Sequence, residues 1–152
     1  MSFYLSKRSE NNLIGVNPTL VNMVRYAIKV TKIDFAVIDG LRTIEEQQAY
    51  VASGASKTMK SKHLTGHAVD LMAYVNGRGC WELPVYDDIA SAMRESALMV
   101  DEALRWGGAW TISDIRTWDL PMGEAQDLYI NQKVIAGKRP FIDAPHFELM
   151  SI

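Results

Sequence analysis

The chain has 152 residues, which is the length of one domain and is enough to bury a sizeable hydrophobic core. Hydrophobic residues make up 48% and charged residues 22% of the sequence, as in ordinary soluble globular proteins. The net charge of -2 disfavours a protein that acts mainly on nucleic acid, because such proteins are usually basic. A single cysteine, Cys80, excludes an intrachain disulfide. We therefore expect one domain over residues 1–152 and no nucleic-acid partner.

The N-terminal segment does not have the pattern of a signal peptide. Lys7, Arg8 and Glu10 stand where a signal peptide needs its apolar stretch. No apolar run approaches the roughly 20 residues of a membrane-spanning helix. We expect a chain made in a cytoplasm, without an export signal and without a membrane partner.

The first predicted elements are a helix, a strand and a second helix. Residues 18–30 have apolar side chains at helical spacing, with Asn17 as the N-cap and Pro18 at the first helical position. Residues 35–38 form a β-rich run before an Asp-Gly turn. Residues 43–53 follow as a helix, because Thr43 and Glu46 fit a capping box. Residues 55–62 are small, polar and basic, which predicts a loop.

The second half of the chain interleaves further strands and helices. Residues 67–74 alternate weakly and predict a strand after a turn at Gly66, and residues 76–79 (N-G-R-G) predict another turn. Residues 85–104 form the longest helical pattern, residues 123–132 a further helix, and residues 146–150 a last strand. The pattern predicts an α+β domain with a small antiparallel sheet flanked by helices.

The three histidines stand beside carboxylates in two short segments. His63, His67 and Asp70 fall in one window of eight residues, and His146 follows Asp143 near the C-terminus. Imidazole and carboxylate groups are zinc ligands, and a catalytic zinc site has three protein ligands.

Two ligand arrangements fit this spacing. His63, His67 and Asp70 form a helical stripe, but the zincin helix needs Glu after the first histidine, and Gly66 disfavours a helix here. Alternatively, His63 lies in a loop, Asp70 on the next strand, and His146 on a distant strand. On a strand, His67 and Asp70 point to opposite faces and do not share a metal.

Four segments resemble one enzyme family. Residues 61–70, S-K-H-L-T-G-H-A-V-D, match the S-x-H-x-x-G-x-A-x-D signature of the zinc D-Ala-D-Ala carboxypeptidase/VanY-like peptidases, and residues 143–146 resemble that family's second motif. Residues 39–48 and the Trp-Gly-Gly at residues 106–108 resemble its phage branch, the L-alanyl-D-glutamate endopeptidases (endolysins). The resemblance implies a Hedgehog/DD-peptidase-like fold and one zinc ion (Zn²⁺) per chain on His63, Asp70 and His146.

The remaining site residues follow from the same resemblance and from the chemistry of amide hydrolysis. Asp143, where many relatives carry Glu, is expected to be the general base. Arg42 is the candidate that steadies the oxyanion or holds a substrate carboxylate, because its planar fork suits both. The alternative is an arginine that only braces the loop. Ser61 either binds the substrate backbone or braces the His63 loop. His67 is expected either to support the ligands from outside the ligand set or to be structural.

Two further groups of residues have alternative interpretations. The basic loop either attracts an anionic wall polymer or is merely solvated. The tryptophans either line a substrate groove or pack in the core. These residues are Lys57, Lys60 and Lys62 in the loop, and Trp106, Trp110 and Trp118.

The resemblance implies a phage-type endolysin that hydrolyses peptidoglycan (murein) stem peptides at the L-Ala–D-Glu bond. We expect a monomer. We also expect no separate wall-binding domain, because the chain ends six residues after His146. We also expect it to be made in the host bacterial cytoplasm and to reach the wall with the help of a holin. The alternatives are a D-Ala-D-Ala carboxypeptidase and a non-enzymatic zinc-containing wall-binding module. A sugar-cleaving lysozyme would need a pair of acidic residues across the glycosidic bond, and no such signature is present.

Overall fold

One antiparallel sheet organises the fold, and its central strand is β2 (Ala68–Val75). The structure is a computed structural model that describes residues 2–150. Within them the strand order is β1-β2-β5-β4, and the short strand β3 also pairs with β2. The other strands are β1 (Asp34–Asp39), β3 (Arg78–Cys80), β4 (Leu104–Trp106) and β5 (His146–Leu149).

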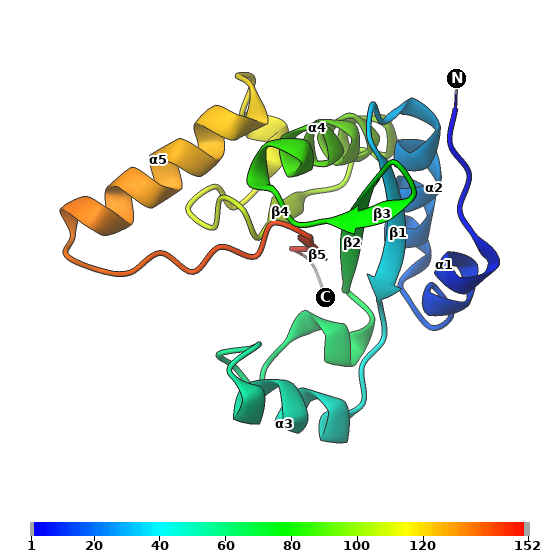
Figure 1. The fold of residues 1–152 in the computed structure, drawn as a ribbon, viewed down its shortest axis with the longest axis horizontal. Helices are drawn as coiled ribbons and strands as arrows, with labels where there is room; N and C mark the ends of the chain where they lie inside the picture. The colour runs from blue at the N-terminus through cyan, green and yellow to red at the C-terminus, as the bar shows by residue number, and fades with distance from the viewer. Residues whose placement is uncertain (1, 151–152) are drawn as a thin grey trace.

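The helices surround this sheet (Figure 1). The long helices α2 and α4 supply much of the core, whereas α3 lies apart below the sheet and α5 projects to one side. The helices are α1 (Lys7–Asn12), α2 (Pro18–Val30), α3 (Ile44–Ser53), α4 (Leu83–Val100) and α5 (Met122–Ile135), with 3-10 turns η1 (Lys62–Thr65) and η2 (Ile115–Thr117). None of these helices is both long enough and apolar enough to cross a membrane.

The two faces of the sheet have different chemistry. Along β2, Val69, Leu71 and Ala73 are fully buried in the hydrophobic core. Successive strand residues point to opposite faces, so Asp70 and Met72 lie on the other face. That face carries the polar residues discussed below, while the apolar face stabilises the domain.

The strand register brings four polar residues onto this second face. Asp70 is the partner of His146 across β2 and β5, and Glu148 is the partner of Arg105 across β5 and β4. His146 and Glu148 are two residues apart on one strand and therefore share a face. A register shift in β1 places Asp39 opposite Asp70.

Most predicted elements are confirmed. The helix over residues 18–30 has the predicted bounds and the Asn17 N-cap, and Thr43 and Glu46 form both bonds of the capping box. The sheet is antiparallel, and the domain is α+β as expected.

The predicted end of the helix over residues 85–104 is wrong. α4 begins at Leu83 and ends at Val100, because Asp101 adopts a left-handed conformation with φ of 54° and stops the helix. Leu104 belongs to β4, where its side chain is fully buried. Its position in the sequence happens to fit the apolar spacing of the helix, which is why the helix was predicted to extend this far. The short elements α1, β3 and β4 were not predicted, since a few residues carry little periodic signal.

The turn at Gly66 is a constraint that can be tested. Gly66 has φ of +76°, and a Cβ there would lie 2.5 Å from the carbonyl oxygen of Gly15. Gly54 is also left-handed, with φ of +82°, but it has no atom within 4 Å of the Cβ position. We expect Gly54→Ala to cost roughly 1–2 kcal/mol of unfolding free energy, the usual cost of a left-handed residue. Gly66→Ala should cost a further 1–3 kcal/mol or so because of the clash. Urea denaturation of both variants measures this difference, and equal losses would contradict the predicted clash.

Candidate metal centre

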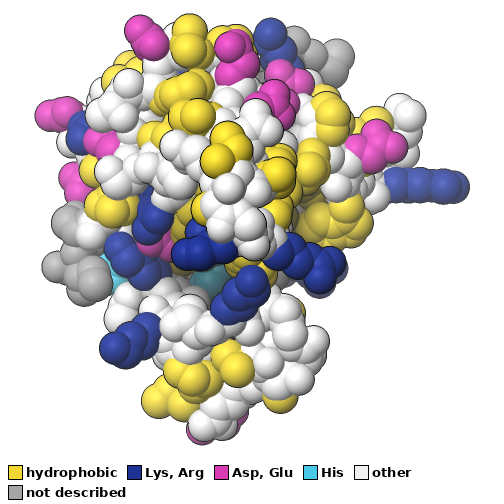
Figure 2. Space-filling view, turned by 90° about the vertical axis from the view of Figure 1, so that its left-hand side faces the viewer, with side chains coloured by type: hydrophobic (Ala, Val, Ile, Leu, Met, Phe, Trp, Pro, Cys, Tyr) yellow, Lys and Arg dark blue, Asp and Glu magenta, His cyan; other side chains and the backbone are white. Residues whose placement is uncertain are grey.

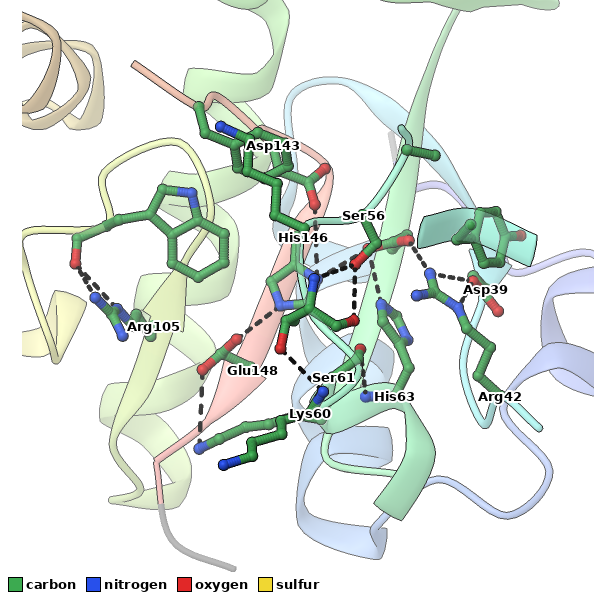
Figure 3. A pocket seen from close by; sticks show the side chains of 18 of the residues that line it. Asp39, Arg42, Ser56, Lys60, Ser61, His63, Arg105, Asp143, His146 and Glu148 are labelled. Carbon is green, nitrogen blue, oxygen red and sulfur yellow. Dashed lines mark hydrogen bonds and ion pairs between the residues drawn. The ribbon is translucent and has the colours of Figure 1, made fainter. Parts of the chain in front are cut away.

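A hollow opens on the polar side of the sheet. Figure 2 shows histidine atoms at the bottom of this hollow and several lysine and arginine side chains around it. The cavity has a volume of about 480 Å³ and is bounded by η1, β2, β5 and the loop over residues 55–62. His63, Asp143, His146 and Glu148 line it (Figure 3). Asp70 lines it as well.

His63 is held in place by the local structure of η1. Ser61 is the N-cap of this turn, and its hydroxyl accepts a hydrogen bond from the His63 N–H at 3.2 Å. Gly66 ends the turn in a left-handed conformation, and the Arg42 N–H donates to the His63 carbonyl at 2.9 Å. The His63 side chain is only 1% exposed. The loop, turn and strand arrangement of residues 61–70 is therefore confirmed, and the helical stripe is wrong because no helix spans these residues.

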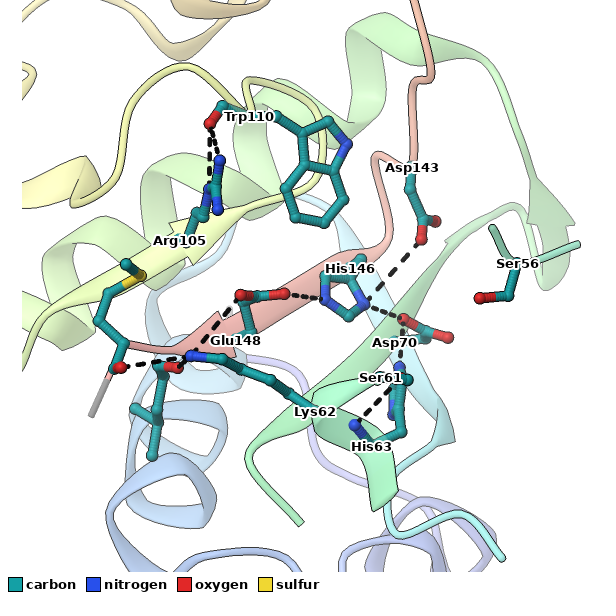
Figure 4. A network of polar contacts seen from close by, with 12 residues as sticks. Ser56, Ser61, Lys62, His63, Asp70, Arg105, Trp110, Asp143, His146 and Glu148 are labelled. Carbon is teal, nitrogen blue, oxygen red and sulfur yellow. Dashed lines mark hydrogen bonds and ion pairs between the residues drawn. The ribbon is translucent and has the colours of Figure 1, made fainter. Parts of the chain in front are cut away.

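Three side chains converge on one point (Figure 4). Asp70 Oδ1 lies 3.2 Å from His63 Nε2 and 3.2 Å from His146 Nδ1. One ligand atom from each of these residues lies within 4.8 Å of the other two. This set of two imidazoles and one carboxylate is a donor set that zinc accepts.

The second nitrogen of each imidazole already has a partner. His63 Nδ1 lies 2.8 Å from the Gly40 carbonyl oxygen, which can only accept, so this nitrogen carries the proton. His146 Nε2 lies 2.8 Å from the carboxylate of Glu148. These contacts place a proton on the outer nitrogen of each ring, so His63 Nε2 and His146 Nδ1 are the nitrogens that would face a metal ion and give up their protons to it, which is the arrangement of imidazoles that bind metals. The triad therefore fits a divalent metal ion.

Arg42 links the triad to β1. Its Nε donates to Asp39 at 2.7 Å, its Nη2 contacts both Asp39 and Asp70, and its Nη1 donates to Gln47 at 2.7 Å. The guanidinium also lies 4.2 Å from the centre of the Tyr50 ring. These contacts use four of the five N–H groups of Arg42.

The loop before β5 positions Asp143 beside the triad. Asp143 Oδ2 lies 4.0 Å from His146 Nδ1. The Asp143 N–H donates to the Gly107 carbonyl at 2.9 Å, and the Gly107 N–H donates to the His146 carbonyl at 2.8 Å. A Cβ at Gly107 would lie 2.3 Å from the Asp143 carbonyl oxygen. Only glycine permits this close contact, which explains the Trp-Gly-Gly segment of the sequence.

The electrostatics distinguish the carboxylates. Burial, followed by the charge of Asp70, raises the pKa of Asp143 to about 6. Burial also raises the pKa of Asp70, but its bonds with His146 and His63 outweigh this effect and hold that pKa well below its usual range. Burial lowers the pKa of His146, but Asp70 and Glu148 raise it to about 10. The protein groups alone thus strongly favour positive charge at the triad, as a metal-binding site requires.

The other predicted site residues have separate places. His67 bonds with Thr65 at 2.8 Å and is not among the residues that line the cavity. Trp110 lines the cavity, whereas Trp106 is fully buried, and its indole N–H donates to the Ala144 carbonyl. Trp118 packs partly against the core. The three lysines of the basic loop all line the cavity.

Glu148 and Arg105 line the cavity but were not among the residues predicted from the sequence. The signal for Glu148 was its position two residues after a predicted ligand on a predicted strand, which places both side chains on one face. Arg105 had no such signal, because its position depends on the pairing of β4 with β5.

Comparisons with known proteins agree with this geometry. A model of the phage L-alanyl-D-glutamate peptidase family matches residues 1–150. The L-alanyl-D-glutamate peptidase of Escherichia phage T5 is 33% identical over 117 residues, which are 74% of this chain and 85% of that relative. The peptidase of the same name from Listeria phage A118 is 32% identical over 116 residues, which are 72% of this chain and 39% of the relative.

A solved structure gives the same result. The crystal structure of the L-Ala D-Glu endopeptidase ChiX of Serratia marcescens is similar with a TM-score of 0.71 and 34% sequence identity. The similarity covers 97% of this chain and 90% of that protein. The extent of these matches shows that the chain belongs to the phage L-alanyl-D-glutamate peptidase family.

Proposed function

We propose that this chain is a zinc peptidase that hydrolyses the L-Ala–D-Glu bond of peptidoglycan stem peptides, as a phage endolysin does. The observation that carries the proposal is the convergence of His63, Asp70 and His146, with Asp143 beside them, in one open cavity. Family membership supports the substrate and the bond. We further propose that the protein acts as a monomer on the wall after holin-assisted release from the host cytoplasm.

In this proposal His63 Nε2, a carboxylate oxygen of Asp70 and His146 Nδ1 would hold one zinc ion. A bound zinc ion lowers the pKa of water towards about 7 and polarises a carbonyl group. The triad leaves the cavity side of the site open for substrate, as catalytic zinc sites do.

Asp143 supplies the proton transfer. Its carboxylate is 34% exposed and reaches the cavity, so it can accept the proton of the attacking water and pass it to the leaving amine. A raised pKa suits this task, because a group that titrates near neutral pH both accepts and returns a proton readily. The charge of a bound metal would lower this pKa.

Arg42 has few N–H groups left for substrate. Most of its N–H groups hold Asp39, Asp70 and Gln47, so its first task is to orient Asp70. One N–H of Nη1 stays available, and we propose that it assists the oxyanion. Ser61 braces the His63 turn. It also lines the cavity, where it can contact the backbone of the substrate.

The ligand set is tested by metal analysis. His63→Ala, Asp70→Ala and His146→Ala should each lose zinc, because a three-ligand site cannot lose one ligand and keep its affinity. His67→Ala is the matched control and should keep a full equivalent, since within residues 2–150 the His67 side chain bonds only with Thr65. Inductively coupled plasma mass spectrometry of the four purified variants measures the metal content. A zinc-free His67→Ala beside a zinc-replete His146→Ala would refute the ligand set.

The support of His146 by Glu148 is tested by affinity. Glu148→Gln keeps the size of the side chain but removes the charge that faces His146 Nε2. Such partners of metal-bound histidines are worth about 10–100-fold in metal affinity, and we expect a loss in that range. Competition with a zinc chelator measures it. The matched control is Glu10→Gln, which removes a surface carboxylate paired with Arg25 and should leave the affinity unchanged. If Glu148→Gln binds zinc as tightly as the parent, this support is absent.

The reaction itself is tested by digestion of purified murein followed by mass spectrometry. The parent should release peptides with new N-terminal D-Glu. Released D-Ala would instead indicate a carboxypeptidase, reducing sugar ends would indicate a lysozyme, and an undigested wall would indicate a binding module.

Asp143→Asn should keep zinc but lose about 10²–10⁴-fold in rate, the usual contribution of a positioned acid/base group. Asp143→Glu should retain part of the activity. A zinc-loaded Asp143→Asn with near-parental activity would remove Asp143 from the mechanism.

A further inference from the structure

Five cationic side chains line the main cavity, and they differ in how their charge is used. Arg42 is paired with Asp39 and Asp70, and Lys62 contacts Glu148 and the Leu149 carbonyl. The other three form no ion pair within 4.0 Å among the residues that the structure describes, although the charge of Arg105 helps to lower the pKa of the neighbouring Glu148. These three are Lys57, Lys60 and Arg105.

The cavity is locally positive, although the chain as a whole has a net charge of -2. Figure 2 shows the lysine and arginine side chains gathered around the hollow. Local positive charge at the mouth of a cavity attracts anionic ligands. The cavity is therefore suited to a substrate that carries a carboxylate in addition to the amide that is cleaved.

Arg105 is the best placed of these three cations. It lies opposite Glu148 in the β4–β5 ladder and on the same face of the sheet as the triad. It also lines a second cavity of about 510 Å³, and Trp110 and Phe141 line both cavities as well, so the two are neighbours. Arg105 therefore borders both cavities and lies next to the residue that supports His146.

The guanidinium of Arg105 is fixed and only partly used. Its Nε donates to the Trp110 carbonyl at 3.0 Å, and its Nη2 donates to the same oxygen. The group also lies 5.2 Å from the centre of the Trp110 ring. Of the five N–H groups of an arginine, these bonds leave three, on Nη1 and Nη2. Two of them form the end-on pair that matches a carboxylate in a bidentate contact. Lys57, by contrast, lies over the Phe141 ring, and both lysines belong to an exposed loop.

The proposed substrate carries the matching group. A glutamate residue within a chain uses one of its two carboxyl groups for its onward link and leaves the other free. In cleavage of an L-Ala–D-Glu bond, this free carboxylate belongs to the leaving-group side and lies a few bonds from the scissile nitrogen. We propose that Arg105 is a specificity-determining residue that binds this free carboxylate. The inference rests on the proposed function, because it takes D-Glu as the residue on the leaving-group side.

Two matched peptides test the inference. One contains L-Ala–D-Glu with the free carboxylate, and the other carries a carboxamide in its place. The parent should prefer the carboxylate peptide. Arg105→Gln should lower kcat/KM for the carboxylate peptide about 10–100-fold, because hydrogen bonds to charged groups are worth about 1.5–3 kcal/mol. It should change the carboxamide peptide less than about 3-fold, since that peptide offers no charge to lose. Arg105→Lys should fall between Arg105→Gln and the parent, because it keeps the charge without the fork.

Controls and a second measurement separate the possible failures. Arg25→Gln, on an exposed helix face, should act as the parent does on both peptides. Calorimetry with the cleavage product that begins with D-Glu reports binding even where nothing is cleaved, and Arg105→Gln should weaken it by a similar factor. Equal losses on both peptides, or loss of the preference in Lys60→Gln in place of Arg105→Gln, would overturn the assignment. If the parent cleaves neither peptide but Arg105→Gln still weakens product binding, the proposed reaction fails and the carboxylate site stands. If product binding is also unchanged, both fail.

Discussion

The site depends on the contacts of the Asp70 carboxylate, which is largely shielded from solvent, with a side chain 15% exposed. It contacts both histidines of the triad and Arg42, and it lies at the centre of the sheet on β2. A buried carboxylate is costly unless it is paired and hydrogen-bonded, and these three partners supply that compensation. The same contacts fix the positions of residues from three separate parts of the chain. Removing Asp70 would therefore leave two imidazoles and a guanidinium close together without their common anion.

Glycines at two positions allow this convergence. Gly66 turns the chain between His63 and Asp70, and Gly107 lets the loop of Asp143 and His146 lie against β4. Neither position has room for a Cβ, so the backbone itself forms the contact. The polar face then receives its ligands from a turn, a strand and a distant strand, while the opposite face of the sheet provides the hydrophobic stability. Catalytic groups held in this way lose little freedom when substrate binds.

The sequence was sufficient to predict the parts of the site that depend on local structure. A turn at Gly66 followed by a strand was one of the two arrangements that the residues allowed, and the family resemblance implied the ligand set that goes with it. The structure brings His63 and Asp70 together in this arrangement, without His67. Glu148 shares a strand face with His146, which the sequence spacing does indicate, but its contact with Nε2 depends on which nitrogen of His146 faces the triad, and a sequence does not carry that information. Arg105 was missed because β4 has only three residues and its partner strand is remote in sequence. The false extension of α4 to Leu104 has the same origin, since a buried strand residue happened to continue a helical pattern.

The central claim is that one zinc ion binds to His63, Asp70 and His146. The most direct test is a crystal structure of the zinc-loaded protein with anomalous diffraction measured at the zinc edge. The account predicts one strong peak per chain, about 2.0–2.2 Å from His63 Nε2, an Asp70 carboxylate oxygen and His146 Nδ1. Glu148 should remain on His146 Nε2, outside the coordination sphere. A peak bound by His67 or by His146 Nε2, or no peak at the triad, would contradict it.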